Sequence, residues 1–409
     1  MAYRSKVTLV YLLGFALDLL NMFVANIAYP QIALELQASV TQLAWISNAY
    51  MLGLTLIIPL SVWLAERLGE RRLIIGSLGL FAVFSLLVAQ AGSIDTLIGW
   101  RLLQGLSGGL LIPIGQALAY RHCPPAERSR LTTWVMLVAL LVPALAPAAG
   151  GLIVQALSWR WVFYANLPLT LLALLLAVLW LKTEAAVQGR PTGEGRAMLL
   201  DLQLLKSPSL RLAMLVYLLV PGVFIGTSLI AVLFLHQLGF GAAQTGALML
   251  PWAVGSGIAI AIGKRGFNRF GPKPLLIIGM LLQSLGLVLL IFIDKPQGLR
   301  PMSAYALMGL GGSLCSSCAQ TLAFVDVHAD RMSHASALWN INRQLSFCLG
   351  AAFLSALLAA LGAQSPLAFE RCFMVAALLT LLPILVVLRF DARKVLALVT
   401  SPSPLKETA

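Results

Sequence analysis

An acidic residue stands in the first long apolar run of the chain, "GFALDLLNMFVANIAYP", Gly14–Pro30. Of the 15 acidic residues in the chain, Asp18 is the only one expected deep inside a membrane-length segment. Burying an ionised carboxylate in hydrocarbon is so costly that such residues usually face a cavity and mark an ion or proton pathway. Asp18 is therefore predicted to carry a proton, and a purely structural hydrogen bond is the alternative.

Two amides follow this acid along the same segment. Asn21 comes three residues and Asn26 eight residues after Asp18, so all three project from roughly one face of a helix. A polar stripe on an apolar helix predicts a wet cavity, and both amides are candidate substrate contacts. Hydrogen bonding between neighbouring helices is the alternative for either residue.

A buried cation is expected in "WRLLQGLSGGLLIPIGQAL", where Arg101 and Gln104 share one helical face. An arginine this deep needs a partner, and Asp18 is the only deep carboxylate available, directly or through water. We predict that Arg101 modulates the proton affinity of Asp18 and that Gln104 contacts substrate. The alternative is an arginine that extends to the membrane surface.

A second polar face occurs in "SALWNINRQLSFCLG", late in the chain. Asn340, Arg343 and Gln344 stand at positions i, i+3 and i+4, so they line one side of a helix. We predict that they form a second cavity wall and bind substrate. Arg343 is available to an anionic substrate group, or it extends to the cytoplasmic surface instead.

The composition is that of a membrane protein. The 409 residues are 60% hydrophobic and only 11% charged, against about 25% charged in soluble domains, and the mean hydropathy is +0.91. Spanning helices need about 20 apolar residues. We predict an all-α protein of twelve spans at 7–29, 44–65, 73–92, 95–119, 131–156, 162–181, 210–235, 244–263, 274–293, 302–325, 335–361 and 369–389.

The net charge of +13 would suggest nucleic-acid binding in a soluble protein. With both termini placed in the cytoplasm, however, 22 of the 28 Lys and Arg residues fall on the cytoplasmic side. This asymmetry is the usual one for inner-membrane proteins. No nucleic-acid partner is needed to explain the charge.

The chain divides at its one long polar stretch between spans. The expected units are a six-helix half at 1–181, a cytoplasmic linker at 182–209, a second six-helix half at 210–390 and a cytoplasmic tail at 391–409. "SVWLAERLGERRLIIG" can be laid on "IGKRGFNRFGPKPLLIIG", which superposes Gly69 on Gly271 and Arg71 on Lys273. The match predicts a tandem repeat, an arrangement in which substrate binds between the halves.

Sites for other chemistry are not evident. Cys315 and Cys318 form a C-x-x-C inside an apolar span, without a second pair or a histidine cluster, so we interpret them as packing residues rather than a zinc or redox site. The sequence has no Walker loop and no nucleotide-binding or metal motif. We expect no cofactor, no metal and no enzymatic activity, and an ion gradient as the energy source.

At this point the residues resemble the major facilitator superfamily, and within it the drug:proton antiporters. "SVWLAERLGERR" is similar to the signature G-x-x-x-D-R-x-G-R-R that follows span two, with Ser61 in place of the leading Gly and Glu66 in place of the Asp. The resemblance implies that Glu66, Arg67, Gly69 and Arg71 form a cytoplasmic gate.

Further motifs follow in the order of that family. "RLLQGLSGG" is similar to the fourth-span motif, whose arginine takes part in proton transfer. "VPALAPAAGG" resembles the antiporter motif of span five, in which Pro147, Gly150 and Gly151 fit and Ala146 replaces a Gly. This departure weakens the inference of antiport.

The details of the resemblance point to one branch. "WRWVFYANLP" and span two are most similar to a branch that usually has fourteen spans, although this chain has room for only twelve. That branch often carries its first-span Asp where Asn21 stands here, one helical turn after Asp18. The proton site has either shifted by a turn, or the coupling has changed.

The resemblance and the residues together predict a monomeric, proton-coupled transporter of the inner membrane whose halves rock around a central site. It would export a small organic molecule, either a metabolite such as a siderophore or a drug. The alternatives are multidrug efflux of lipophilic cations, an importer or facilitator, and a non-transporting receptor. The expected partners are substrate, protons and the lipid bilayer.

Overall fold

The computed structural model describes residues 3–122, 128–182, 202–293, 298–327, 332–363 and 365–391. Within these ranges the regular structure is entirely helical. The first group of α-helices runs from the N-terminus to the central linker: α1 (Tyr3–Val24), α2 (Tyr29–Leu36), α3 (Val40–Ile57), α4 (Ser61–Leu68), α5 (Glu70–Ala89), α6 (Ile94–Gly108), α7 (Leu111–Arg121), α8 (Arg128–Ala156), α9 (Arg160–Tyr164) and α10 (Asn166–Trp180).

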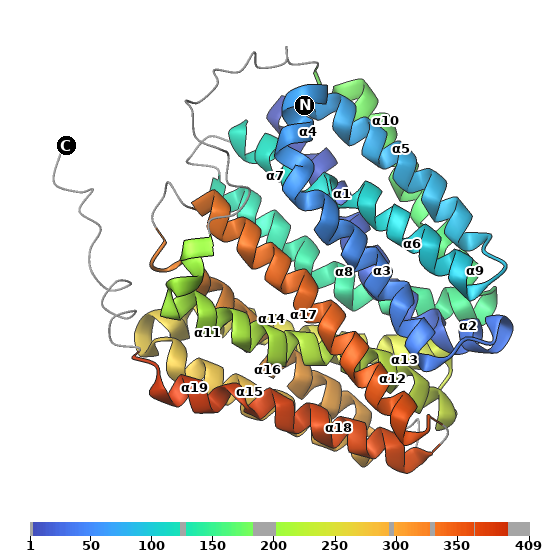
Figure 1. Ribbon diagram of the computed structural model, residues 1–409, viewed down its shortest axis with the longest axis vertical. Helices are drawn as coiled ribbons and strands as arrows, with labels where there is room; N and C mark the ends of the chain where they lie inside the picture. The colour runs from blue at the N-terminus through green and yellow to red at the C-terminus, as the bar shows by residue number, and fades with distance from the viewer. Residues whose placement is uncertain are drawn as a thin grey trace.

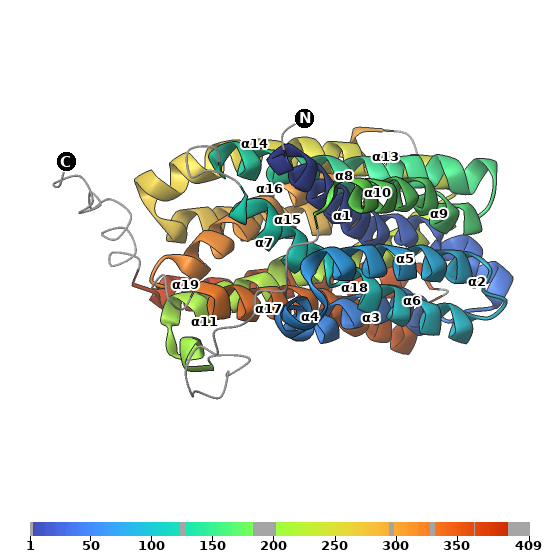
Figure 2. The same ribbon diagram turned by 90° about the horizontal axis from the view of Figure 1, so that it is seen from above.

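The second group follows the linker and completes the bundle: α11 (Pro208–Tyr217), α12 (Val223–Gln237), α13 (Ala242–Ala247), α14 (Met249–Phe270), α15 (Pro272–Ile291), α16 (Leu299–Phe324), α17 (Met332–Leu361), α18 (Pro366–Leu381) and α19 (Pro383–Arg389). Figure 1 shows the first group in blue to green beside the second in yellow-green to red, and Figure 2 shows the helices running along one common direction. The predicted domain boundaries, including the linker 182–209 that lies mostly outside the described residues, remain predictions.

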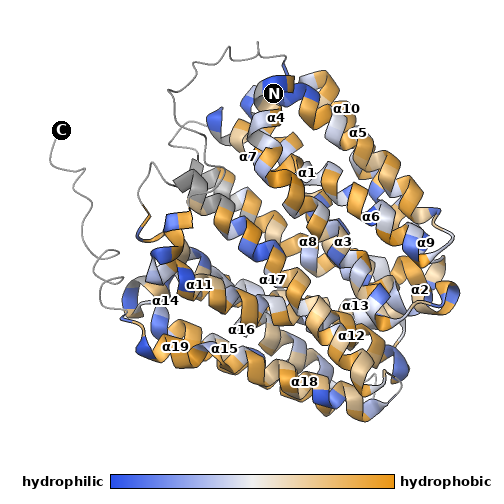
Figure 3. Cartoon of the chain, viewed as in Figure 1, coloured by the Kyte–Doolittle hydropathy of each residue, from blue (hydrophilic) through white to orange (hydrophobic). Residues whose placement is uncertain are grey.

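Eleven helical segments of the described residues are long and apolar enough to cross a membrane. They correspond to all the predicted spans except 302–325, so the count of twelve is not confirmed. That segment forms the 26-residue helix α16, which is rich in Gly, Ser and Cys. Small residues lower its hydropathy and let it pack closely, since Gly309 lies against the backbone of Trp252 in α14. Figure 3 shows that apolar residues dominate the helices and that polar residues gather at their ends.

The first segment of each group is broken in its middle. A 3₁₀ turn, η1 (Ala25–Ala28), separates α1 from α2 just before Pro30. A π-helical turn, η5 (Leu218–Gly222), separates α11 from α12 and contains Pro221, which cannot donate an intrahelical hydrogen bond. Interrupted helices at matching positions of two repeats are a pointer to a transport site between them.

The predicted repeat is visible in the loops after α4 and α14. Gly69 and Gly271 both cap a helix with positive φ, at 81° and 76°, which an L side chain would strain. Arg71 Nη2 donates to the carbonyl of Val178 in α10 at 3.0 Å, and Lys273 Nζ donates to that of Leu388 in α19 at 2.7 Å. The residue pair superposed from the sequence thus makes the same contact with the last long segment of each group.

Helices of the two groups meet along α3 with α17 and along α8 with α13. We name the end of the bundle that carries Arg71 and Lys273 the basic end. At the opposite end α8 and α13 cross very closely: a side chain added at Gly151 would strike the backbone of Ala242, and one added at Gly246 would strike that of Pro147. The two groups are therefore packed backbone to backbone at the end away from the basic loops.

Candidate functional site

Asp18 lies on α1 in the interior of the bundle and is 4% exposed. It is the sole buried acid of the described residues. The hydroxyl of Tyr50, on α3, donates to Asp18 Oδ1 at 2.7 Å. Two arginines lie near enough for their charge to act on Asp18: Arg343 of α17 and Arg101 of α6. The carboxylate therefore faces positive charge from both groups of helices.

Arg101 does not form the predicted pair with Asp18. Its guanidinium donates instead to Gln104 Oε1 at 2.7 Å and to the Asn21 side chain and main chain at 3.3 and 3.2 Å. It also lies over the ring of Tyr50, 4.3 Å from the centroid. Since Arg101 is completely buried, the alternative of a surface-reaching arginine is wrong. The physical reason for the difference is that Tyr50 fills the space between the two charges.

Asn21 is the centre of a polar cluster that joins four helices. Its Oδ1 accepts from Arg101, from Gln104 Nε2 at 3.3 Å and from Asn166 Nδ2 at 3.1 Å. Gln104 Nε2 also donates to Ser85 Oγ at 2.8 Å. Both predicted substrate residues, Asn21 and Gln104, have these protein partners, so here they orient Arg101, and their contact with substrate remains a prediction.

Asn26 lies in the η1 break, where its Oδ1 accepts from Ser47 Oγ at 3.3 Å. Ser47 also shares a hydrogen bond with the hydroxyl of Tyr29 at 2.5 Å. These bonds attach the break to α3. The structure favours the alternative that Asn26 joins two helices.

The predicted second wall contains buried polar atoms without a partner. Arg343 Nε and Gln344 Oε1, both on α17, are buried and make no hydrogen bond, and Asn340 precedes them on a half-buried position. Asn48 Oδ1 on α3 is likewise buried without a partner. The thiol of Cys348, one turn after Gln344, contacts the main chain of Asn48 at 3.9 Å. Unpaired polar atoms therefore line both sides of the contact between α3 and α17.

Sequence reasoning missed Tyr50, Asn48 and Asn166. The signal for the first two was present, because "SNAY" places polar residues within an otherwise apolar span. Asn166 gave no comparable signal, since it stands alone at the start of α10.

The predicted gate residues lie at the basic end. The guanidinium of Arg67 stacks on Trp63 at 4.4 Å, and Gly69 and Arg71 make the contacts already described. The side chain of Glu66 lies outside the described residues. Glu70, which was not predicted, forms a two-pronged ion pair with Arg121 of α7 at 2.8 and 3.2 Å.

The residues of the predicted antiporter motif lie on α8, which stays helical through Pro147. Gly150 faces Val24 of α1, whereas Gly151 faces the backbone of α13. The motif therefore forms the close crossing at the end opposite the basic loops. Its role in antiport remains a prediction.

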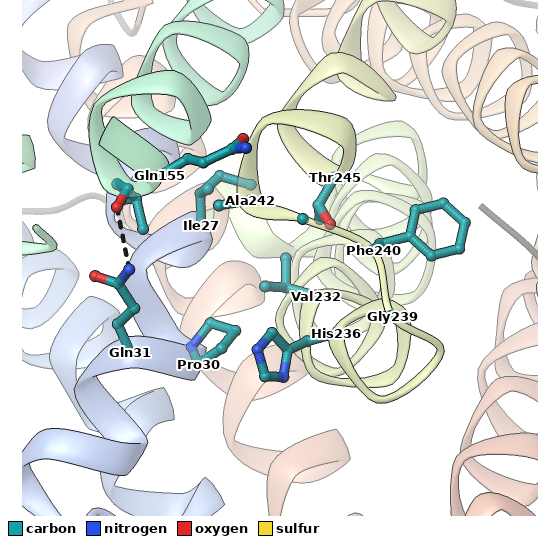
Figure 4. A pocket seen from close by; sticks show the side chains of 12 residues that line it. Ile27, Pro30, Gln31, Gln155, Val232, His236, Gly239, Phe240, Ala242 and Thr245 are labelled. Atoms are coloured by element: carbon teal, nitrogen blue, oxygen red, sulfur yellow. Dashed lines mark hydrogen bonds between the residues drawn. The ribbon is translucent and has the colours of Figure 1, made fainter. Parts of the chain in front are cut away.

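A pocket of about 330 Å³ lies beside this crossing, with walls from both groups of helices. Figure 4 shows Gln31 and Pro30 of α2 on one side and His236, Phe240 and Thr245 on the other. Gln31 is held there by a bond to the carbonyl of Val154 at 3.0 Å. None of the predicted site residues lines this pocket.

The two cysteines of the C-x-x-C motif act as packing residues. The Cys315 and Cys318 thiols are buried and donate to the carbonyls of Leu276 and Pro272 in α15, at 3.5 and 3.6 Å. Within the described residues, no group of His, Cys, Asp or Glu is arranged to hold a metal ion.

Comparison with known proteins then decides the family. The sequence model of the Major Facilitator Superfamily matches residues 11–351. The chain belongs to the major facilitator superfamily. This result confirms the resemblance read from the motifs, and it makes the protein a multi-pass membrane transporter by family.

Relatives in this superfamily carry names that refer to drug resistance. The chain is 27% identical over 412 residues to "Putative multidrug resistance protein MdtD" of Salmonella heidelberg, covering 86% of both chains. It is 27% identical over 396 residues to "Multidrug resistance protein B homolog" of Mycobacterium tuberculosis, covering 83% of this chain and 73% of that one.

A solved transporter structure supports the fold. A bacterial homologue of the human lysosomal transporter Spinster, in an inward-facing and unoccupied conformation, superposes with a TM-score of 0.74. The match covers 99% of both chains at 14% sequence identity. At this identity the likeness concerns the fold alone.

Proposed function

We propose that the protein is a proton-coupled secondary transporter of the inner membrane that exports a small organic molecule by alternating access. It would have twelve spans in two six-helix halves, 1–181 and 210–390, act as a monomer and keep both termini in the cytoplasm. The observation that carries the proposal is the buried carboxylate of Asp18, which faces arginines of both groups of helices. Such an acid in a transporter is most simply explained as an ion site.

In this mechanism Asp18 takes up a proton from one side of the membrane and releases it to the other as the halves rock. Proton binding removes the negative charge between Arg101 and Arg343, so the two protonation states of Asp18 leave different net charges at the centre of the bundle. A change in central charge is a differential interaction that can bias two conformations. The residues around Glu66–Arg71 would latch the basic end.

Substrate would bind where α3 and α17 face each other. Arg343 Nε offers a donor, and Asn48 Oδ1 and Gln344 Oε1 offer acceptors, all buried and without hydrogen-bond partners. A buried polar atom without a partner costs about 1–3 kcal/mol, and a bound molecule would recover that cost. With Asn340 nearby on α17, these groups suit a neutral or anionic metabolite that both accepts and donates hydrogen bonds.

A second candidate, efflux of lipophilic cations, is favoured by the drug-resistance names of the relatives. A cation would compete with the proton for Asp18, which accounts directly for antiport. Ethidium and citrate, tested side by side as probes of the two classes, separate these candidates by which one moves. If the protein is an importer, the probe should accumulate in intact cells rather than in everted vesicles.

The test of proton coupling replaces Asp18 with Asn in everted membrane vesicles energised by respiration. We expect Asp18→Asn to reduce proton-driven accumulation of the transported probe at least tenfold, because the amide cannot exchange a proton. The matched control is Asp95→Asn, which removes an exposed carboxylate at the start of α6. Unchanged accumulation by Asp18→Asn would overturn the proposed coupling.

A further inference from the structure

Tyr50 occupies the space between the buried acid and the buried arginine. Its side chain is 0% exposed, its hydroxyl donates to Asp18 Oδ1 at 2.7 Å, and its ring carries the Arg101 guanidinium at 4.3 Å. Asp18 and Arg101 come from different helices, α1 and α6, and form no ion pair with each other. Tyr50 of α3 thus contacts both.

The surroundings of Tyr50 hold it in this position. A side chain at Gly105 would strike the main chain of Tyr50, and one at Gly108 would press on its hydroxyl and on Phe81. Both glycines follow Arg101 on α6, so the same helix that supplies the arginine is also shaped to admit the tyrosine. Arg101 is fixed in turn by Asn21, Gln104 and the carbonyl of Ile46 at 3.2 Å.

We propose that Tyr50 is the positioning residue that links Arg101 to the proton site at Asp18; this deepens the proposed function and rests on it. The Tyr50 hydroxyl donates to the ionised carboxylate and so stabilises it. Donation to an anion makes the phenol ring more electron-rich, which strengthens the attraction of the ring for Arg101. When Asp18 gains a proton, both interactions weaken together.

The other charged groups around Asp18 are few. Arg343 on α17 acts on it across the contact between the two groups of helices. Helices α7, α8 and α10 also pack against α1. The described side chains of α8 and α10 include no titratable group, and Arg121 of α7 pairs with Glu70 at the basic end. Removal of the Tyr50 hydroxyl therefore tests the link between Arg101 and Asp18 without changing the charge of any side chain.

The test measures reaction of Asp18 with dicyclohexylcarbodiimide, which attacks protonated carboxyl groups in apolar surroundings and needs no substrate. The full-length protein in proteoliposomes is labelled at a pH where the wild type reacts slowly, and the modified peptide is quantified by mass spectrometry. We expect Tyr50→Phe to raise the labelling rate about fivefold, since a hydrogen bond to the ionised form is lost. The ring under Arg101 is retained, so this variant is expected to fold.

Two controls make the result specific. Tyr305→Phe removes the hydroxyl of another buried tyrosine, on α16, and should leave labelling of Asp18 within twofold of the wild type. In a double-mutant cycle, Arg101→Gln should change labelling less in the Tyr50→Phe background than in the wild type, because part of its effect passes through Tyr50. Asp18→Asn must abolish the signal.

Equal labelling in Tyr50→Phe and wild type would overturn the inference, as would an equal rise in Tyr305→Phe. Strict additivity of Tyr50→Phe and Arg101→Gln would also overturn the link to Arg101. Failure of the proposed function would give a different result. The Asp18→Asn variant would still show proton-driven accumulation of the transported probe, whatever the labelling of Asp18 shows.

Discussion

At the scale of residues, the centre of the bundle is organised around one amide rather than around an ion pair. Asn21 Oδ1 accepts from Arg101, Gln104 and Asn166, which belong to α6 and α10. Because all three donors are buried, each of them loses a hydrogen-bond acceptor when the Asn21 side chain is removed. The arrangement explains how a fully buried arginine is kept without a carboxylate next to it.

Replacement of Asn21 by Ala should therefore destabilise the protein by about 2–3 kcal/mol, the cost of leaving buried donors unsatisfied. The comparison is Asn26→Ala, which loses a single bond to Ser47 and should cost about 1 kcal/mol. Denaturant titration of the protein in detergent measures both. Equal losses in the two variants would contradict the central role of Asn21.

At the scale of elements, close helix crossings are made by glycines at repeated positions. Gly53 and Gly105 bring α3 onto α6, and Gly255 and Gly309 bring α14 onto α16 in the same way. The repeat does not extend to the polar cluster. When Gly105 of α6 is matched with Gly309 of α16, the position of Arg101 is occupied by Tyr305. The scaffold is therefore shared by the two groups of helices, whereas the buried charge belongs mainly to the first.

The close crossing of α8 and α13 joins the two groups of helices, and adding a single methyl group there tests its role. Gly246→Ala places a side chain against the backbone of Pro147, so the ends of α8 and α13 opposite the basic loops should no longer close. A cysteine at Val232, buried in the nearby pocket, should then react at least fivefold faster with an impermeant maleimide.

The matched control is Gly257→Ala, on α14 facing α8, where the added methyl would meet only Leu140 at an ordinary 3.7 Å. It should leave the reactivity of Val232→Cys unchanged. If both alanine variants behave alike, the close crossing does not control access to the pocket.

At the scale of the whole molecule, the basic loops after α4 and α14 lie at the same end of the bundle. The ion pair of Glu70 with Arg121 and the bonds of Arg71 and Lys273 to helix carbonyls all lie there. Large apolar side chains remain exposed along the outer helices, such as Leu175 and Leu179 of α10. This distribution suits a bundle in lipid with its basic end in the cytoplasm.

Reporter fusions test that orientation. Alkaline phosphatase inserted after Gly92, between α5 and α6, should be active, and the same enzyme inserted after His122 should be inactive, because it folds only outside the cytoplasm. Green fluorescent protein gives the reverse pattern and serves as the control. Activity of the phosphatase after His122 would reverse the predicted topology.

The sequence by itself determined the membrane class, nearly all the spans, the repeat and the candidate acid. These follow from local quantities: the length of apolar runs, the side on which Lys and Arg fall, and the cost of one carboxylate in hydrocarbon. They need no knowledge of which helices are neighbours. Asp18 could be singled out for this reason alone.

Only the tertiary structure decided what surrounds Asp18. Tyr50 is 32 positions from it in the chain, and it separates Asp18 from the arginine that sequence reasoning had paired with it. The family match likewise fixed the fold without assigning a partner to any buried side chain. Helical periodicity gives the face on which a residue lies, but the residue it meets depends on how separate helices cross, and that is set by packing of the whole bundle.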